Sequence, residues 1–444
     1  MIKRIAAYFD LAGNDTTLRR EIAGGATTFL AMAYIIFVQP QVLRAAGMDA
    51  GSVMVATCLA AAVGSIIMGI LANYPIGVAP GMGENFFFTY TIVIAMGVPW
   101  EQALAIVFVS GVLFILLTLF KIRELVITAV PDCLKQSIAV GIGLFIALIG
   151  LHEAGFVVAN PGGLVKLGVL SEAPVLLAIF GLIVTAVLLV RGYRGAILIG
   201  MLVTAFAGVA TGILQFSGVV SAPPSIAPTF LHMDIAGIMH WEFVAPVVIF
   251  LYMALFDTIG TLIGVTSQAG IMKDGKIPRA SRALMADAVA TTAGAALGTS
   301  TTLAYIESIT GVKVGARTGI AAIVVGLLFL VALFFSPLVG MVGGGIKLAG
   351  GLVVHPVTAP ALVLVGSMMM WGVRKIDWDR YDEAIPAFLT IVAIPFTYSI
   401  AEGIAVGFVT YPLIKLLSGK GREVSWLVYL LGALFALKYI FITA

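Results

Sequence analysis

Apolar runs close to the length of a bilayer span follow one another along most of the chain, separated by short polar or glycine-rich breaks. A membrane-spanning helix needs about 20 mostly apolar residues. The runs fall at about 22–43, 52–72, 76–96, 102–120, 134–152, 173–190, 194–214, 243–268, 283–298, 318–336, 357–372, 384–398 and 401–417. With the interrupted stretch 300–313, they predict about fourteen transmembrane segments. A last run, 425–442, is short and carries Lys438, so it lies at the interface, packs on the bundle or forms a further span.

The third and tenth segments are broken. In the third, Pro75 and Pro80 remove amide donors, and Gly83 lies just beyond them. In the tenth, the hydroxyl residues Thr299 to Thr302 favour extended backbone over helix. Such backbone is tolerated at membrane depth only inside protein or around a cavity, and broken segments in corresponding positions indicate a binding site. We therefore expect short strands in both segments, with a helix beginning near Gly83.

Acidic and amide side chains lie beside these breaks and inside the eighth segment. Asp257 stands in the middle of the eighth run, Glu307 follows the hydroxyl stretch, and Asn85 stands at the expected helix start. A charge at this depth costs a few kcal/mol or more and by default marks a functional site. Structural alternatives stay open: Glu307 could lie in a polar loop among headgroups, and Asp257 could form a buried hydrogen bond between helices.

Composition places the chain in the membrane. It is 61% hydrophobic and 11% charged, whereas soluble domains have about 25% charged residues. The net charge of +3 comes from basic residues clustered at loop ends, which argues for topology and against nucleic-acid binding. Four Lys or Arg residues precede the first span. The long loops 153–172 and 215–242 contain one Lys or Arg between them, Lys166. The positive-inside rule then predicts a cytoplasmic N-terminus in a multi-pass protein of the cytoplasmic (inner) membrane.

The long loop near the centre divides the chain into seven segments and seven more. An odd number of segments in each half requires the two halves to be inverted, which is a recurrent transporter design. No His-Glu-x-x-His pair and no Gly-x-Ser-x-Gly motif occurs, so an enzyme is not expected. Histidines occur only at the ends of runs or in loops, so a carried proton is expected to reside on a carboxylate.

Four motifs in order resemble the nucleobase–cation symporters of the nucleobase–ascorbate transporter superfamily, in the AzgA-like branch of hypoxanthine/adenine/guanine permeases. The motifs are Gly81-Met82-Gly83-Glu84-Asn85, Phe256-Asp257-Thr258-Ile259-Gly260-Thr261-Leu262, Ala286-Asp287-Ala288, and Leu297-Gly298-Thr299-Ser300-Thr301 with Glu307-Ser308. The resemblance extends to about residue 417. The chain departs from many branch members at Ala254, where they carry an acid. It differs from the uracil branch near Thr261, where those relatives carry a histidine.

The resemblance implies an all-α polytopic fold in which a core domain moves against a gate domain, with short strands in the third and tenth segments. The expected divisions are a cytoplasmic N-terminus 1–21, core halves 22–123 and 243–337, gate halves 124–215 and 338–418, an extracytoplasmic linker 216–242 and a C-terminal hydrophobic segment 419–444. It also implies a homodimer formed through the gate domain.

The function implied is proton-coupled import of purine nucleobases by alternating access. The expected substrate-binding residues are Asn85, Asp257, Glu307, Phe256, Thr261, Thr301, Thr302, Gly83 and Glu84. Asp257 and Glu307 are the expected proton-coupling residues. No metal or organic cofactor is expected, although sodium in place of the proton stays open. The alternatives are a uracil- or xanthine-type symporter and an anion exchanger of the same architecture, but two acids at the site argue against the exchanger.

Overall fold

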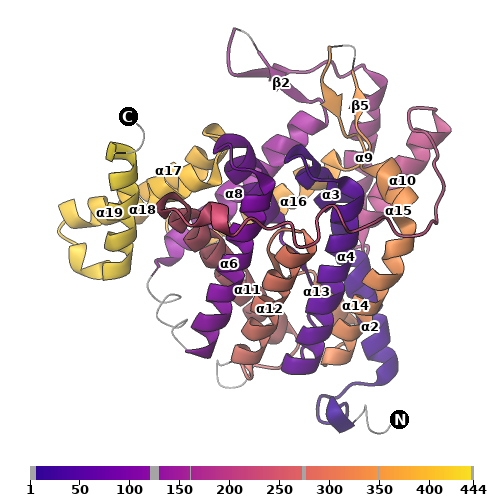
Figure 1. The fold of residues 1–444 in the computed structure, drawn as a ribbon, viewed down its shortest axis with the longest axis horizontal. Helices are drawn as coiled ribbons and strands as arrows, with labels where there is room; N and C mark the ends of the chain where they lie inside the picture. The colour runs from indigo at the N-terminus through magenta and orange to yellow at the C-terminus, as the bar shows by residue number, and fades with distance from the viewer. Residues whose placement is uncertain (1–6, 121–129, 161, 273–276, 349, 442–444) are drawn as a thin grey trace.

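The computed structural model describes residues 7–120, 130–160, 162–272, 277–348 and 350–441, the last four of these without their side chains. Most of the described chain is helical (Figure 1). In the first half the helices are α2 (Leu18–Met32), α3 (Ile35–Ala45), α4 (Ala50–Ile67), η1 (Met68–Ala72), α5 (Met82–Phe86), η2 (Phe87–Ala95), α6 (Trp100–Leu119), α8 (Asp132–Glu153), α9 (Ala173–Val190) and α10 (Ala196–Ala210). The expected domain boundary between 123 and 124 lies outside the described residues.

The second half continues the same pattern after the short turns η3 (Ala236–Ile238) and η4 (Trp241–Phe243). Its helices are α11 (Val244–Gln268), α12 (Ala280–Leu297), α13 (Ser308–Val314), α14 (Gly319–Ala332), η5 (Leu333–Phe335), α15 (Ser336–Val342), α16 (Ala359–Met369), η6 (Met370–Lys375), α17 (Tyr381–Phe396), α18 (Ile400–Leu417), η7 (Gly421–Glu423) and α19 (Trp426–Phe441).

Helical stretches long and apolar enough to cross a membrane number eight within the described ranges. They are Leu18–Ala45, Ala50–Ala72, Trp100–Leu119, Asp132–Glu153, Ala173–Val190, Trp241–Gln268, Gly319–Val342 and Ile400–Leu417. Polar caps fix where some of them begin. Asp49 caps α4 by accepting the amide of Ser52 (2.8 Å), and the hydrogen bonds from Ser52 lower the pKa of Asp49. The chain is therefore a helical, multi-pass integral membrane protein.

A two-stranded antiparallel sheet joins the two halves of the chain. Strand β1 (Val78–Pro80) pairs with β4 (Thr302–Ala304), and Ala79 lies opposite Leu303. Beyond the strands, the amide of Gly81 donates to the carbonyl of Thr301 (2.9 Å). Helix α5 follows β1 and α13 follows β4, so each strand leads into a short helix. Of the four hydroxyl residues Thr299 to Thr302, only Thr302 belongs to strand β4. Helix α5 begins at Met82, one residue before Gly83.

The structure also contains two short hairpins that the sequence did not predict, in addition to the strands expected in the third and tenth segments. Strand β2 (Val157–Ala159) pairs with β3 (Val165–Leu167), and β5 (Ile346–Lys347) pairs with β6 (Val353–Val354). Both hairpins project from the same end of the helices (Figure 1). Strands of two or three residues are too short to give a period-two pattern of hydrophobic positions, which explains why the sequence did not predict them.

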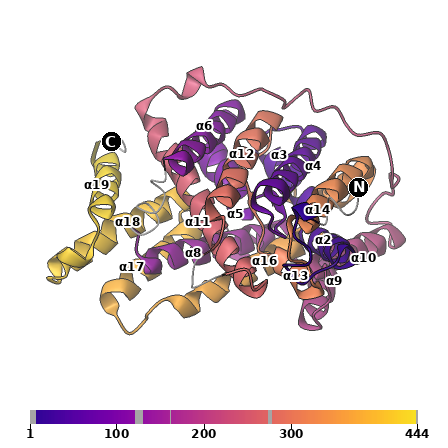
Figure 2. The ribbon, with the colours of Figure 1, turned by 90° about the horizontal axis from the view of Figure 1, so that it is seen from below.

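The helices contact one another in two groups, which lie on opposite sides when the molecule is turned (Figure 2). One group contains α2, α4, α6, α12, α13 and α14, and the other contains α8, α9, α16, α17 and α18. Small residues allow close packing within a group. A Cβ on Gly366 of α16 would collide with the backbone oxygen of Gly143 of α8, so only glycine permits this approach. Helix α19 packs against α18 at the edge of the second group.

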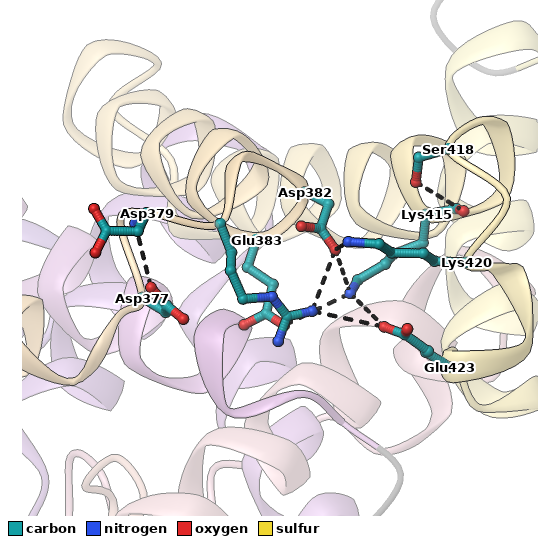
Figure 3. A network of polar contacts seen from close by, with 9 residues as sticks. Asp377, Asp379, Asp382, Glu383, Lys415, Ser418, Lys420 and Glu423 are labelled. Atoms are coloured by element: carbon teal, nitrogen blue, oxygen red, sulfur yellow. Dashed lines mark hydrogen bonds and ion pairs between the residues drawn. The ribbon is translucent and has the colours of Figure 1, made fainter.

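A charged network ties the ends of α17 and α18 together (Figure 3). The ammonium of Lys415, whose side chain is 1% exposed, pairs with Asp382 (2.6 Å) and Glu423 (2.8 Å). Arg380 pairs with Glu383 (2.9 Å) beside it. Because several carboxylates surround the buried ammonium, its charge is compensated and the network holds the two helices together.

Candidate functional site

The broken segments meet through a network of amides and hydroxyls. The side-chain amide of Asn85 donates to Oε1 of Gln39 in α3 (2.7 Å). Gln39 in turn donates to the hydroxyls of Thr299 (3.0 Å) and Ser300 (2.8 Å). All four residues are buried, and the Oδ1 atom of Asn85 has no hydrogen-bond partner among the described residues. The network fixes the end of the strand pair and leaves one acceptor of Asn85 available.

Glu307 lies on the other side of the strand pair, directly before α13. Its Oε1 atom accepts the hydroxyl of Tyr34, the residue just before α3 (3.0 Å), and Glu307 is half-buried. The neighbouring hydroxyl of Tyr305 donates to the carbonyl of Pro80 (2.5 Å) and so ties this segment to β1. One hydroxyl occupies only part of the acceptor capacity of a carboxyl group, so Glu307 has further lone pairs for N–H donors.

Asp257 lines a small cavity between the two helix groups. The cavity measures about 30 Å³, enough for a water molecule but smaller than a bicyclic base. Its lining consists of Gly83, Lys135, Ile138, Ala139, Ile142, Tyr252, Met253, Phe256, Asp257 and Met369. Asp257 is exposed there, although it stands in the middle of α11.

Glu84 lies behind the cavity, at the start of α5. It is fully buried, and neither of its carboxyl oxygens has a hydrogen-bond partner among the described residues. The carboxyl folds over Gly81, where any Cβ would collide with it. Its carboxyl interacts with that of Asp257 of α11. Two acids that are far apart in the sequence are therefore brought together.

An aromatic and a basic side chain complete the cavity wall. The ammonium of Lys135 lies over the ring of Phe256, 5.1 Å from its centroid, and pairs with Asp132 (2.9 Å). The ring of Tyr252 packs against Phe256 with a centroid distance of 4.2 Å. Phe256 therefore presents an aromatic surface beside Asp257, and the charge of Lys135 is already compensated.

The expected site residues divide between these places. Gly83, Phe256 and Asp257 line one cavity, whereas Glu307 lies outside its lining. Thr301 and Thr302 are buried around the strand end, and Thr261 is buried on α11. The sequence-based reasoning did not identify Tyr34, Gln39 or Lys135. Tyr34 and Gln39 stand inside the mostly apolar first run, and their polarity was the signal that could have identified them, although Thr27, Thr28 and Gln41 share it.

Asp287 and the phenylalanines after Asn85 lie outside the lining of the cavity beside Asp257. Asp287 of α12 is buried and accepts the hydroxyl of Thr258 (2.5 Å), a bond that joins α12 to α11. The three phenylalanines that follow Asn85 are fully buried and are absent from the cavity lining. A larger cavity of about 220 Å³ lies between α3, α4 and α15, where Arg44 is part of its lining. It contains none of the expected site residues.

The opposite end of α8 contacts α3 and η2 through polar and aromatic side chains. Glu153, the last residue of α8, accepts the amide of Gln41 (2.5 Å) and the hydroxyl of Tyr90 (3.4 Å). The ring of Tyr398 packs edge-on against both Tyr90 (5.8 Å) and Phe145 (5.0 Å). The cavity beside Asp257 contacts the first half of α8, so this contact and the cavity lie toward opposite ends of that helix.

Comparison with known proteins identifies the family. The family model named Xan_ur_permease, described as "Permease family", matches residues 19–406. The chain belongs to this family. It is similar over its whole length to a putative permease of Methanocaldococcus jannaschii, with 49% identity and complete coverage of both chains. This places the chain among the transporters and not among the enzymes.

Two characterised relatives carry more specific names. The guanine/hypoxanthine permease PbuG of Bacillus subtilis is 46% identical, over 98% of this chain and 99% of its own length. The adenine permease AdeP of Escherichia coli is 44% identical, over 100% of this chain and 97% of its own length. This transporter therefore belongs to the part of the family that contains purine permeases, in agreement with the motifs.

Solved structures share the fold at low sequence identity. The transmembrane domain of the cyanobacterial bicarbonate transporter BicA aligns with a TM-score of 0.63 at 14% identity, covering 87% of this transporter and 97% of BicA. The structure of SLC26A9 aligns with a TM-score of 0.63 at 9% identity, covering 90% of this transporter and 66% of that chain. At such identities the likeness concerns the fold alone.

Proposed function

We propose that this transporter imports purine nucleobases across the cytoplasmic membrane in symport with protons. The observation that carries the proposal is Asp257, an acid lining a cavity in the middle of a membrane helix, beside the paired strands and the aromatic ring of Phe256. The names of the full-length relatives, which are permeases for guanine, hypoxanthine and adenine, support the same substrate class.

The groups around the strand pair suit a flat, neutral base that carries both donors and acceptors. The carboxylates of Asp257 and Glu307 accept N–H groups from a ring nitrogen or an exocyclic amine. Phe256 supplies a surface for stacking, and the free Oδ1 of Asn85 supplies a further acceptor. An anion would meet acids at these positions, and the nearby ammonium of Lys135 is already paired with Asp132.

The transport cycle proposed is alternating access between two inverted halves, with about fourteen segments and a cytoplasmic N-terminus. The antiparallel meeting of two strand–helix units, one from each half, supports the inverted arrangement. The contact of Glu153 with Gln41 and Tyr90 would close one side, while the cavity beside Asp257 would open toward the other. In the orientation given by the positive-inside rule, the closed side faces outward.

A proton gradient supplies enough free energy to accumulate a purine base from a dilute outside solution. One proton moving through about 100 mV releases about 2.3 kcal/mol. A one-unit difference in pH adds about 1.4 kcal/mol. Together these terms support a purine gradient of about a few hundred-fold. An import stoichiometry of one proton per base is therefore sufficient.

Uptake measurements test this function directly. Cells or vesicles containing the protein are supplied with labelled adenine, guanine, hypoxanthine, xanthine or uracil, with and without an uncoupler. Accumulation of a purine that the uncoupler abolishes is expected, and sodium replacement shows whether sodium serves instead of the proton. Exchange of sulfate or bicarbonate without purine binding would contradict the proposal.

Association through the second helix group, the proposed gate domain, is part of the same proposal. Helices α17 and α18 expose apolar side chains, among them Phe388 (53% exposed) and Leu413 (50% exposed). These surfaces suit a homodimer within the bilayer. A dimer mass in mild detergent and in lipid is expected, and a purely monomeric mass in both would contradict it.

A further inference from the structure

Among the described residues, no group donates a hydrogen bond to the carboxyl of Glu84. It is fully buried at the start of α5, and both of its carboxyl oxygens lack a hydrogen-bond partner among the described residues. An isolated ionised carboxylate in such surroundings is very costly. Yet the glycine at position 81 leaves room for the carboxyl, because any Cβ there would collide with Glu84. The fold therefore accommodates a buried carboxyl that needs either a proton or a ligand.

A second acid, Asp257 of α11, interacts directly with Glu84. Helix α5 contacts α11, and Gly83, the residue before Glu84, lines the same cavity as Asp257. When two carboxylates share a site, ionisation of one disfavours ionisation of the other. A pair that holds one proton forms a strong O–H···O⁻ hydrogen bond, which satisfies an oxygen on each residue. The pair would titrate as a unit and not as two separate residues.

Other titratable groups around the pair are engaged elsewhere or are weak acids. They are Asp287 of α12, Tyr305 after β4, Lys135 of α8 and Tyr252 of α11. Asp287 accepts the hydroxyl of Thr258. Lys135 pairs with Asp132 on its own helix. Neither residue compensates a charge on Glu84, so a proton shared with Asp257 is the remaining way to do so.

We propose that Glu84 and Asp257 share one proton, and that this pair, not Asp257 alone, is the group whose protonation is coupled to base binding. The inference rests on the proposed proton-coupled purine transport. Asp257 is exposed to the cavity, whereas Glu84 is buried. The two carboxyls therefore have different roles in our proposal. The proton enters through Asp257 and passes to Glu84. Asp257 is then an anionic acceptor for an N–H of the base, and the buried Glu84 is neutral.

The decisive variant is Glu84→Gln, which keeps the size of the side chain but cannot store a proton. Labelled-purine binding, exchange and uphill uptake are measured in proteoliposomes between about pH 5.5 and pH 8.5. When one proton is linked to binding, Kd changes by up to about tenfold per pH unit. Wild type is expected to show this slope. Glu84→Gln is expected to bind and exchange purine with less than about a twofold change over the range, and to lose uphill uptake.

Two comparisons make the result decisive. Glu84→Asp retains a carboxyl and is expected to restore pH dependence, whereas Glu101→Gln, the same substitution at the start of α6, is expected to behave as wild type. If Glu84→Gln still shows uphill uptake with the pH dependence of wild type, the proposal that Glu84 and Asp257 share a proton is wrong. Folded Glu84→Gln protein that no longer binds purine would make Glu84 a base contact instead.

A poorly folded Glu84→Gln protein leaves Glu84→Asp to decide. Because Glu84→Asp keeps the carboxyl, pH-dependent uphill uptake by this variant supports the shared proton. Binding that does not depend on pH in this variant overturns the proposal. Absence of uphill purine uptake in wild type would refute the proposed function itself, which distinguishes that failure from failure of the pair.

Discussion

Asp257 and Glu307 are both acids at membrane depth in the second half of the chain, but their surroundings differ. Glu307 has a protein donor, the hydroxyl of Tyr34 at 3.0 Å, and is positioned before a helix start. Asp257 faces a cavity on one side and another acid, Glu84, on the other. The difference supports our proposal of separate roles, in which an acid with a donor suits direct recognition of the base and an acid next to another acid suits the proton.

The largest effect on binding is expected from Glu307→Gln. The amide keeps the shape but lacks the charge and one acceptor, so binding should be abolished or a different purine preferred. A hydrogen bond to a charged group contributes about 1.5–3 kcal/mol, which corresponds to about a 10- to 150-fold weaker Kd. Equilibrium binding of each purine measures this. Tyr34→Phe is the matched control and should cost less, about 0.5–1.5 kcal/mol. If Glu307→Gln binds every purine with the affinity of wild type, Glu307 does not take part in recognition of the base.

Asn85→Ala should have an intermediate effect on binding. Loss of one hydrogen bond to the base is expected to weaken binding by about 1–3 kcal/mol while the protein stays folded. Gln39→Leu removes the protein partner of Asn85 but keeps its free oxygen, so it should weaken purine binding less. If both substitutions change affinity equally, Asn85 stabilises the strand end and does not contact the base.

Lys415→Met should affect stability and leave binding unchanged. The ammonium is buried but fully paired, so by the comparison above it is a structural group. Breaking a buried pair costs on the order of 3 kcal/mol. Thermal unfolding in detergent should show a lowered melting temperature, whereas Lys420→Met, at a more exposed position of the same network, should cost about 1 kcal/mol or less. A changed purine affinity in Lys415→Met would contradict a purely structural role.

Much of the helical framework was predictable from the sequence because the period and length of apolar runs report membrane helices directly. Prolines, glycines and hydroxyl residues also predicted the breaks in the third and tenth segments. The two surface hairpins were not predictable, since their strands are too short for a pattern. The domain divisions expected from the resemblance stay a prediction.

The site was predictable as a set of residue types but not as a set of partners. Asp257, Glu307 and Asn85 are conspicuous because charge and amide groups are costly in apolar segments. The neighbour of each depends on how distant segments pack. Tyr34 meets Glu307 and Gln39 meets Asn85 only because α3 crosses beside the strand pair. The roles of these side chains in binding and coupling stay predictions.

The most direct test of the account is Asp257→Asn in purified, reconstituted protein. Asparagine keeps the shape and hydrogen-bonding capacity of Asp257 but fixes the group neutral. With an acidic outside solution, wild type should accumulate labelled purine. The variant should bind purine and exchange labelled for unlabelled base, with a flattened pH dependence and no accumulation. If Asp257→Asn still concentrates purine against a gradient, Asp257 does not carry the proton and the role passes to another acid of the site.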